Sequence, residues 1–254
     1  MTTPTDEEVI VLTGANDGIG FHLLTALAED NRQIAVLDIN GDNVLDVHDD
    51  LSARVRYYEC DVTDTDDVNT AVDEIIGQWG RIDILVNNAG VARVGFFQER
   101  SPADTRREFE VNFFGYQRLI RAVLPHMRAQ ETGIIHNMCS GTADTGHAGL
   151  TGYSATKGAI KAFVRSLRLE LRDTDVSCTL MIPPSTNTGM TAELEYPEWM
   201  TVEPEEVGRT LAEKIYSTEP VITPDMTTRI GLSLTRRFPF LWRRMTEGTV
   251  KNSE

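Results

Sequence analysis

Short apolar runs alternate with longer amphipathic stretches along most of this 254-residue chain. A run of about four to six apolar residues between polar ones is typical of a buried strand, and apolar positions at helical spacing predict a helix. The strand-like runs lie at 8–13, 34–37, 55–59, 82–86, 133–138 and 177–182. Helices are expected over 21–28, after an acidic start at 64–67, and over 102–128 and 151–171. This alternation predicts right-handed βαβ units, and hence an α/β fold with a doubly wound parallel sheet and helices on both faces.

Size and composition favour one domain over about 6–250. A 28.3 kDa chain with 41% hydrophobic residues can bury one large core. Its apolar runs are far shorter than the roughly 20 residues needed to span a bilayer. The first eight residues are polar and acidic and carry no secretion signal, so a cytoplasmic protein is expected. The three cysteines, Cys60, Cys139 and Cys178, are too widely spaced for a disulfide framework or a metal cluster, so we expect them reduced and mostly buried, with no metal.

The charge of the chain is strongly acidic but unevenly spread. The net charge of −15 argues against nucleic acid as a partner, because binding phosphates requires a basic surface. From Asp225 to Glu254, six basic residues face three acidic ones, which gives +3 and leaves −18 for the rest. The C-terminal segment therefore presents a different kind of surface.

The first predicted strand runs directly into a glycine-rich loop and a helix. The loop reads Thr13-Gly14-Ala15-Asn16-Asp17-Gly18-Ile19-Gly20. Glycines let the backbone turn tightly and approach a pyrophosphate, which then lies at the positive end of the helix. Strand, loop and helix together predict a dinucleotide site.

The second strand ends in Asp38, eighteen residues beyond Gly20. A carboxylate at this place accepts hydrogen bonds from the adenosine ribose hydroxyls and repels a 2′-phosphate. The positions where a basic residue would hold that phosphate are instead occupied by Asn16, Asp17, Ile39 and Asn40. The sequence therefore favours NAD over NADP.

Tyr153 and Lys157 are four residues apart in a predicted helix, so both side chains fall on one face. A tyrosine phenol has an ordinary pKa of about 10, and a neighbouring cation stabilises the phenolate and lowers that pKa. The pair predicts proton-transfer chemistry, although Tyr-x-x-x-Lys also occurs by chance in soluble helices.

Several motifs in order along the chain carry a family resemblance. They are the Thr13–Gly20 loop, Asp61-Val62, Asn87-Asn88-Ala89-Gly90, Asn112 within Val111-Asn112-Phe113-Phe114-Gly115, Ser140 thirteen residues before Tyr153, and Lys157. Together they resemble the short-chain dehydrogenases/reductases, from Thr13 to about Thr188. The resemblance implies a single-domain Rossmann fold and a hydride transfer between carbon 4 of a nicotinamide and the carbinol carbon of an alcohol.

The resemblance also implies a role for each catalytic side chain. Tyr153 would be the general acid/base, and Lys157 would lower its pKa and bind the nicotinamide ribose. Ser140 would hold the substrate oxygen, and Asn112 would support a water relay linked to the lysine. The residues expected to bind the cofactor are Thr13, Gly14, Asn16, Asp17, Gly18, Ile19, Gly20, Asp38, Asp61, Val62, Asn88, Ala89, Gly90, Tyr153, Lys157, Pro183, Thr186 and Thr188.

The sequence departs from the family after the sixth strand, where Pro183-Pro184 replaces the usual Pro-Gly. Proline fixes φ and lacks an N–H, so the loop beside the nicotinamide is expected to follow a different path. Thr188 still matches the family threonine that reaches the carboxamide. The adenine end of the site is therefore better defined by the sequence than the nicotinamide end.

A substrate loop is expected at about 184–202. Its apolar members are Met190, Leu194, Tyr196, Pro197, Trp199 and Met200. Apolar clefts bind by burying area, which leads us to expect a bulky or lipophilic secondary alcohol or ketone, such as a steroid, terpene or acyl chain. The alternative is that these residues only pack the loop against the protein.

The basic and apolar C-terminal segment, about 225–248, is atypical for the family. A cationic, aromatic helix can lie on an anionic membrane surface or cover a cleft, and it can equally pack its apolar face on the core. The resemblance implies a homo-oligomer; a dimer is favoured, because the altered C-terminus makes a tetramer-forming interface doubtful. A catalytically silent NAD-binding sensor or scaffold and an NAD-using epimerase remain alternatives to an alcohol dehydrogenase or ketone reductase.

Overall fold

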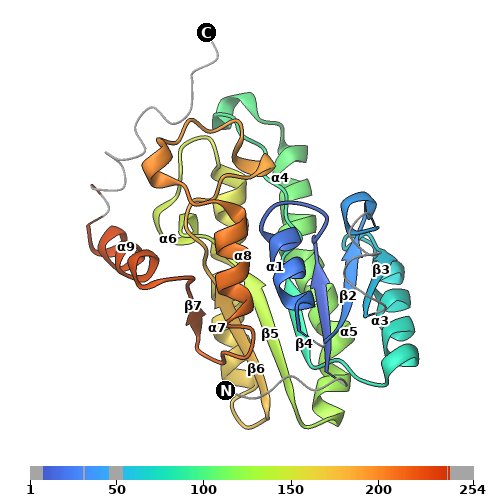
Figure 1. Ribbon diagram of the computed structural model, residues 1–254. Helices are drawn as coiled ribbons and strands as arrows, with labels where there is room; N and C mark the ends of the chain where they lie inside the picture. The colour runs from blue at the N-terminus through green and yellow to red at the C-terminus, as the bar shows by residue number, and fades with distance from the viewer. Residues whose placement is uncertain (1–7, 31, 46–53, 239, 241–254) are drawn as a thin grey trace.

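The computed structural model describes residues 8–30, 32–45, 54–238 and 240, and within them it contains one seven-stranded parallel sheet. The strand order is β3-β2-β1-β4-β5-β6-β7, with the strands placed side by side in Figure 1. The strands are β1 (Val9–Thr13), β2 (Gln33–Asp38), β3 (Val55–Glu59), β4 (Ile84–Asn87), β5 (Gly133–Met138), β6 (Val176–Met181) and β7 (Val221–Ile222). Chain order reverses between β1 and β4, so the predicted doubly wound parallel sheet is confirmed.

Helices cover both faces of this sheet, as predicted. They are α1 (Gly18–Ala28), α3 (Thr65–Trp79), α4 (Pro102–Phe109), α5 (Tyr116–Ala129), the short α6 (Thr142–Thr145), α7 (Thr151–Glu170), α8 (Pro204–Ala212) and α9 (Met226–Arg237). Asp64, in the predicted acidic start, caps α3 by accepting from the N–H groups of Asp66 and Asp67.

The prediction of one continuous helix over 102–128 is wrong in one respect. A π-helical turn, Glu110–Gly115, separates α4 from α5. The turn holds Asn112, and its last residue lies so close to Val62 that an added Cβ on Gly115 would be 2.9 Å from Val62 Cγ2. Such turns are rare and frequent at functional sites, and this one shapes the region behind the groove described below.

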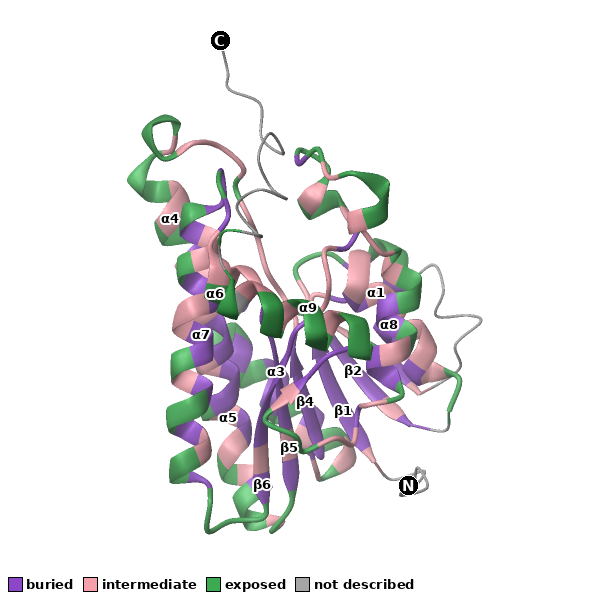
Figure 2. Cartoon of the chain, turned by 90° about the vertical axis from the view of Figure 1, so that its left-hand side faces the viewer, coloured by how far each residue is buried: buried purple, intermediate pink, exposed green. Residues whose placement is uncertain are grey.

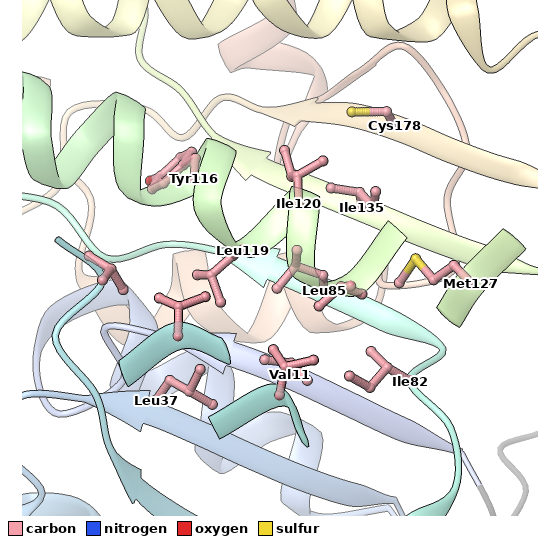
Figure 3. Close-up of a cluster of buried hydrophobic side chains, with 14 of the residues drawn as sticks. Val11, Leu37, Ile82, Leu85, Tyr116, Leu119, Ile120, Met127, Ile135 and Cys178 are labelled. Carbon is pink, nitrogen blue, oxygen red and sulfur yellow. The ribbon is translucent and has the colours of Figure 1, made fainter. Parts of the chain in front are cut away.

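Two hydrophobic cores lie on opposite faces of the sheet because alternate strand residues point to opposite sides. Val9 and Val11 pack with α3, α5 and α7, whereas Ile10 and Leu12 pack with α1 and α8. Figure 3 shows part of the first core, with Leu37 and Leu85 beside Val11. The central strands are buried throughout in Figure 2. The three cysteines are free and buried within these described regions, as expected.

The C-terminal third leaves the sheet and then returns to it. α8 packs closely on α1, where an added Cβ on Gly208 would be 2.6 Å from the His22 carbonyl carbon. α9 lies near α6 and is largely exposed (Figure 2). Leu232 packs against the core. An apolar stripe of exposed side chains, Met226, Ile230 and Leu234, runs along the helix and continues to Phe238 just after it. The predicted segment continues past residue 240, outside the described residues.

None of the helices in the described part of the chain is both long enough and apolar enough to cross a membrane.

Candidate active site

The glycine loop between β1 and α1 is a cradle with no room for side chains. Gly14 has a φ of +66°, and an added Cβ there would be 2.5 Å from Ala89 Cα. On Gly20 an added Cβ would be 2.1 Å from the Gly14 carbonyl oxygen. Asn88 closes the loop from β4 by donating to the Gly14 oxygen at 2.7 Å. The backbone is therefore free to approach a ligand at the N-terminus of α1, which suits a pyrophosphate.

Thr13 acts behind this loop. It is fully buried, and its hydroxyl oxygen accepts from the backbone N–H groups of Asn88 at 3.0 Å and Ala89 at 2.9 Å. The end of β1 is thereby tied to the end of β4. Its part in the site is to hold the two loops together.

Asp38 lies at the end of β2 with its carboxylate beside the glycine loop. One oxygen accepts from the Asn16 N–H at 3.0 Å, and the other accepts from the Asn40 N–H at 3.3 Å. Asn16 is also bonded to Asn43, whose N–H donates to the Asn16 side-chain oxygen at 2.9 Å. These bonds fix the carboxylate at the edge of the groove, where the ribose was expected.

A groove of about 930 Å³ runs along the carboxyl ends of the strands. Most of the predicted site residues line it: Gly14, Asn16, Asp17, Gly18, Ile19, Gly20, Asp38, Asp61, Val62, Asn88, Ala89, Gly90, Tyr153, Lys157, Pro183 and Thr188. Four predicted residues do not line it: Thr13, Asn112, Ser140 and Thr186. The structure thus brings one end of the glycine loop and the Tyr153–Lys157 pair into a single groove.

Tyr153 and Lys157 lie in the first two turns of α7, where Lys157 is buried and Tyr153 is partly exposed. Lys157 Nζ lies 5.5 Å from the centre of the Tyr153 ring. The ammonium donates to the Met138 carbonyl at 2.9 Å and to the Tyr116 hydroxyl at 3.4 Å. Lys157 therefore lies over the face of the Tyr153 ring, while its hydrogen bonds go to β5 and α5.

The pKa of Tyr153 moves opposite to the sequence-based expectation. Burial raises the pKa of the phenol above its ordinary value and outweighs the hydrogen bond from Ser140, which lowers it. Burial also lowers the pKa of Lys157 to about 8. A net lowering of the phenol pKa is therefore not found in this structure, because desolvation is the largest influence on it.

Ser140 reaches the reaction centre from the end of β5. It is hydrogen-bonded to Tyr153, and its oxygen accepts from the Thr142 hydroxyl at 3.0 Å and the Thr142 N–H at 3.2 Å. The predicted Ser140–Tyr153 proximity is present, although the two residues are thirteen positions apart in the sequence.

Asn112 lies behind the groove and connects three segments. Its side-chain oxygen accepts from the Val91 N–H at 2.8 Å, and its amide donates to the Val91 carbonyl at 2.9 Å. The same amide donates to the Thr156 hydroxyl at 3.2 Å, and that hydroxyl donates to the Tyr153 carbonyl at 2.7 Å. Asn112 thus fixes the loop after β4 to the helix that carries Tyr153.

The loop after β6 forms the remaining wall. Pro183 and Thr188 line the groove. The Thr188 methyl lies close to Gly18, because a Cβ added to Gly18 would be 3.3 Å from it. Thr186 is buried and donates its hydroxyl hydrogen to the Pro184 carbonyl at 3.0 Å. Thr188 therefore faces the cofactor cradle, whereas Thr186 holds the loop from behind.

Sequence reasoning missed two neighbours of the predicted centre. The first is Tyr116, whose hydroxyl contacts Lys157. It is four residues after Asn112, a helical spacing that was a usable signal.

The second is His147, which is hydrogen-bonded to Tyr196 at 2.8 Å. His147 Nδ1 lies 2.6 Å from the Ala148 carbonyl. Because a carbonyl only accepts, Nδ1 carries the hydrogen, so Tyr196 donates to Nε2. This bond ties the expected substrate loop to the segment before α7.

The substrate loop is only partly a wall of the groove. Met190 lines the groove and Leu194 is buried, but Trp199 is 72% exposed. Within the described parts of the chain there is also no group of three or more side chains suited to a metal ion.

A parallel doubly wound sheet, a glycine cradle and a tyrosine–lysine pair in one groove are features typical of a nucleotide-dependent oxidoreductase. The chain belongs to the short-chain dehydrogenase family, whose model, described as short chain dehydrogenase, matches residues 8–199.

Curated relatives and solved structures agree with this assignment. The chain is 33% identical over 187 residues to 2,3-dihydro-2,3-dihydroxybenzoate dehydrogenase of Bacillus subtilis, covering 72% of this chain and 71% of the relative. It is 29% identical over 196 residues to 7alpha-hydroxysteroid dehydrogenase of Escherichia coli K12, covering 76% of each. A Burkholderia phymatum short chain dehydrogenase/reductase in complex with NAD has the same fold, with a TM-score of 0.81, 22% identity and coverage of 97% and 98% of the two chains.

Proposed function

We propose that this protein is an NAD-dependent dehydrogenase or reductase that transfers a hydride between nicotinamide and a secondary alcohol or ketone. The observation that supports it most is that Tyr153 and Lys157 line the same groove as the glycine cradle, with Ser140 hydrogen-bonded to Tyr153. When bound, the dinucleotide supplies hydride chemistry, and the chain supplies binding, orientation and a proton.

Each of the catalytic-type residues has a separable role in this proposal. Tyr153 transfers the proton to or from the substrate oxygen, and Ser140 holds that oxygen by a hydrogen bond. Lys157 binds the nicotinamide ribose and supplies positive charge beside the ring of Tyr153. Asn112 acts through position, since its side chain is bonded to Val91 and Thr156 rather than exposed in the groove.

The preference for NAD rests on the carboxylate of Asp38. It stands fixed at the groove, and its groove-lining neighbours Leu37, Ile39 and Asn40 carry no positive charge. A 2′-phosphate placed here would meet like charge without a compensating cation. The cations that line the groove, Arg107 and Lys157, come from α4 and α7 instead.

A bulky or lipophilic substrate is supported by the apolar side of the reaction end. Val91, Ala92 and Met190 line the groove there, and Leu194 anchors the substrate loop. The similar Escherichia coli protein is, by its name, a dehydrogenase of a hydroxysteroid. A steroid, terpene or acyl-chain alcohol fits this surface by burying apolar area.

The test is the change in NADH absorbance with a panel of secondary alcohols: steroids, terpenols, long-chain hydroxyacyl compounds and polyols, each with NAD and with NADP. We expect turnover with NAD and one lipophilic class. Activity confined to small polyols would overturn the substrate class, and binding of NADH without turnover of any compound would favour a redox sensor or scaffold. Conversion of a chiral alcohol without net NADH formation would favour an epimerase.

Three further features belong to this proposal. The chain acts as one cytoplasmic domain of about 6–250, and it forms a homodimer that sedimentation would reveal by a mass of two chains. The exposed stripe on α9 supports peripheral contact of the C-terminal segment with an anionic membrane. Co-sedimentation with anionic vesicles, compared with neutral ones, tests that contact.

A further inference from the structure

A buried ion pair lies beside the residue that precedes Tyr153. Arg100 Nη2 donates to Glu108 Oε2, and the two side chains are 3% and 2% exposed. The other carboxylate oxygen accepts from the Arg93 N–H at 2.9 Å. Arg100 comes from the loop after β4 and Glu108 from α4, so the pair joins two segments that reach the reaction centre.

The pair packs directly on the N-terminal turn of α7. An added Cβ on Gly152 would be 1.9 Å from Glu108 Oε2 and 2.8 Å from Arg100 Nη2. Gly152 is buried, and Tyr153 follows it in the same helical turn. A neighbouring backbone bond, from the Gly95 N–H to the Gly149 carbonyl at 3.0 Å, holds the loop after β4 to the segment before α7.

The pair is poorly suited to a role in stability alone. Arg100 Nε and Nη1 are buried and have no hydrogen-bond partner among the described residues. Buried unpartnered donors destabilise the folded state, and replacement of a buried ion pair by apolar residues is often neutral or stabilising. What Arg100 does provide is a fixed positive charge that balances the carboxylate of Glu108.

We infer that the buried Arg100–Glu108 pair, packed against Gly152, is a positioning device that sets the place of Tyr153 and keeps the charge beneath it balanced. This inference rests on the proposed acid/base role of Tyr153. Gly152 permits the close approach, and Glu108 and Arg100 fix the start of α7. Neither Glu108 nor Arg100 lines the groove.

The electrostatic surroundings of Tyr153 support a charge effect as well as a steric one. The negative charge of Glu108 raises the pKa of Tyr153, although less than burial does. The titratable, charged and hydroxyl groups that face Tyr153 are Glu108, Cys139, Ser140, Lys157, Tyr196 and Tyr116. Glu108 is the one carboxylate in this set, so its charge is the feature to vary.

The charge is tested by Glu108→Gln and the double variant Arg100→Met/Glu108→Gln. Glu108→Gln keeps the size of the side chain and an acceptor for Arg93 but leaves the arginine cation unbalanced, which favours the phenolate. The double variant restores neutrality. We expect the Tyr153 titration midpoint to fall by about one pH unit in the single variant and to return most of the way in the double variant.

The midpoint is read by ¹⁹F NMR of protein labelled with 3-fluorotyrosine, whose phenol is more acidic than that of tyrosine, and Tyr153→Phe assigns the signal. This readout does not need turnover. If the midpoint moves as expected but no alcohol or ketone is turned over, the inference stands and the proposed function fails. If turnover is found but Glu108→Gln leaves the midpoint unchanged, the inference fails and the function stands.

The steric part is tested by Gly152→Ala, with Gly158→Ala on the same helix as its control. An added Cβ on Gly158 meets only the Ala143 oxygen at 3.9 Å, so that variant fits without displacement. We expect kcat to fall at least about tenfold in Gly152→Ala while NADH affinity stays within about twofold, and the control to match wild type. Wild-type kcat in Gly152→Ala would overturn the inference, and this arm also decides it if Glu108→Gln does not fold.

Discussion

The two ends of the groove are built in different ways. The cradle end consists of backbone and short side chains within a few residues of Thr13–Gly20, closed by Asn88. The reaction end consists of long, buried polar side chains from separate segments, including Lys157 on α7 and Tyr116 on α5. The cradle end is therefore sensitive to added volume, whereas the reaction end is sensitive to charge and to distant packing.

The largest expected effect on cofactor binding comes from adding volume to the cradle. In Gly20→Ala the new Cβ would lie 2.1 Å from a backbone oxygen and 2.5 Å from Asn88 Nδ2, so the loop must move. We expect NADH affinity to fall by about 100-fold, measured by NADH fluorescence titration, because overpacking of this kind costs about 1–3 kcal/mol. Gly77→Ala is the control, since nothing lies within 4 Å of its added Cβ. Unchanged affinity in Gly20→Ala would show that the cradle tolerates volume.

A charge effect of similar size is expected at the reaction end. The pKa of Lys157 is lowered to about 8, so the native state carries the cost of a buried cation below that pH. As pH rises from 8 toward the ordinary lysine value of about 10.4, the native lysine loses its proton while the unfolded one keeps it, and stability rises.

Lys157→Met removes this titration while keeping most of the side-chain volume. Relative to that variant, the wild-type free energy of unfolding should increase by about 2 kcal/mol between pH 8 and pH 10. Urea unfolding of both proteins at each pH measures the difference, and other titrating groups cancel in it. A flat difference across this range would mean that Lys157 keeps an ordinary pKa.

Removing one charge from the cradle end should change cofactor choice with little effect on the fold. Asp38→Asn keeps an oxygen that accepts from the Asn16 N–H but loses the charge that repels a 2′-phosphate. We expect the ratio of kcat/KM for NADP to that for NAD to rise about tenfold, or about 1.4 kcal/mol. An unchanged ratio would assign the cofactor preference to another part of the groove.

The smallest effect is expected in the substrate loop. Tyr196→Phe removes the hydrogen that Tyr196 donates to His147 and also the hydrogen bond between Tyr196 and Ser185; each neutral hydrogen bond is worth about 1 kcal/mol. The substrate KM should rise about fivefold with kcat within twofold. Trp199→Phe is the control in the same loop, because Trp199 is 72% exposed. A fall in kcat in Tyr196→Phe would place Tyr196 among the residues that assist the chemistry.

The cradle end of the groove could be predicted from the sequence more fully than the reaction end. Local sequence patterns predict the strands, the glycine cradle and Asp38. The positions of the glycines and of an acidic residue at a strand end depend mainly on their neighbours in the sequence. Gly14, Asn16 to Gly20 and Asp38 line the groove, and their binding of the cofactor stays a prediction. The family resemblance added Ser140, whose hydrogen bond to Tyr153 the structure shows.

The reaction end was less predictable because its contacts are long-range. No local pattern shows that Lys157 donates to Met138 and Tyr116, or that Arg100 and Glu108 pack on Gly152. Helical periodicity also does not reveal the π-helical turn at 110–115, which tertiary contacts stabilise. The phenol pKa was predicted in the wrong direction for the same reason, since burial is a property of the assembled fold.

The most direct test of the account compares Tyr153→Phe with wild type in two measurements, NADH formation on the best alcohol of the panel and NADH affinity. The proposed acid/base role predicts that turnover falls by about 10³-fold while the dissociation constant of NADH stays within about threefold. A Tyr153→Phe protein that keeps most of its turnover would contradict the central claim.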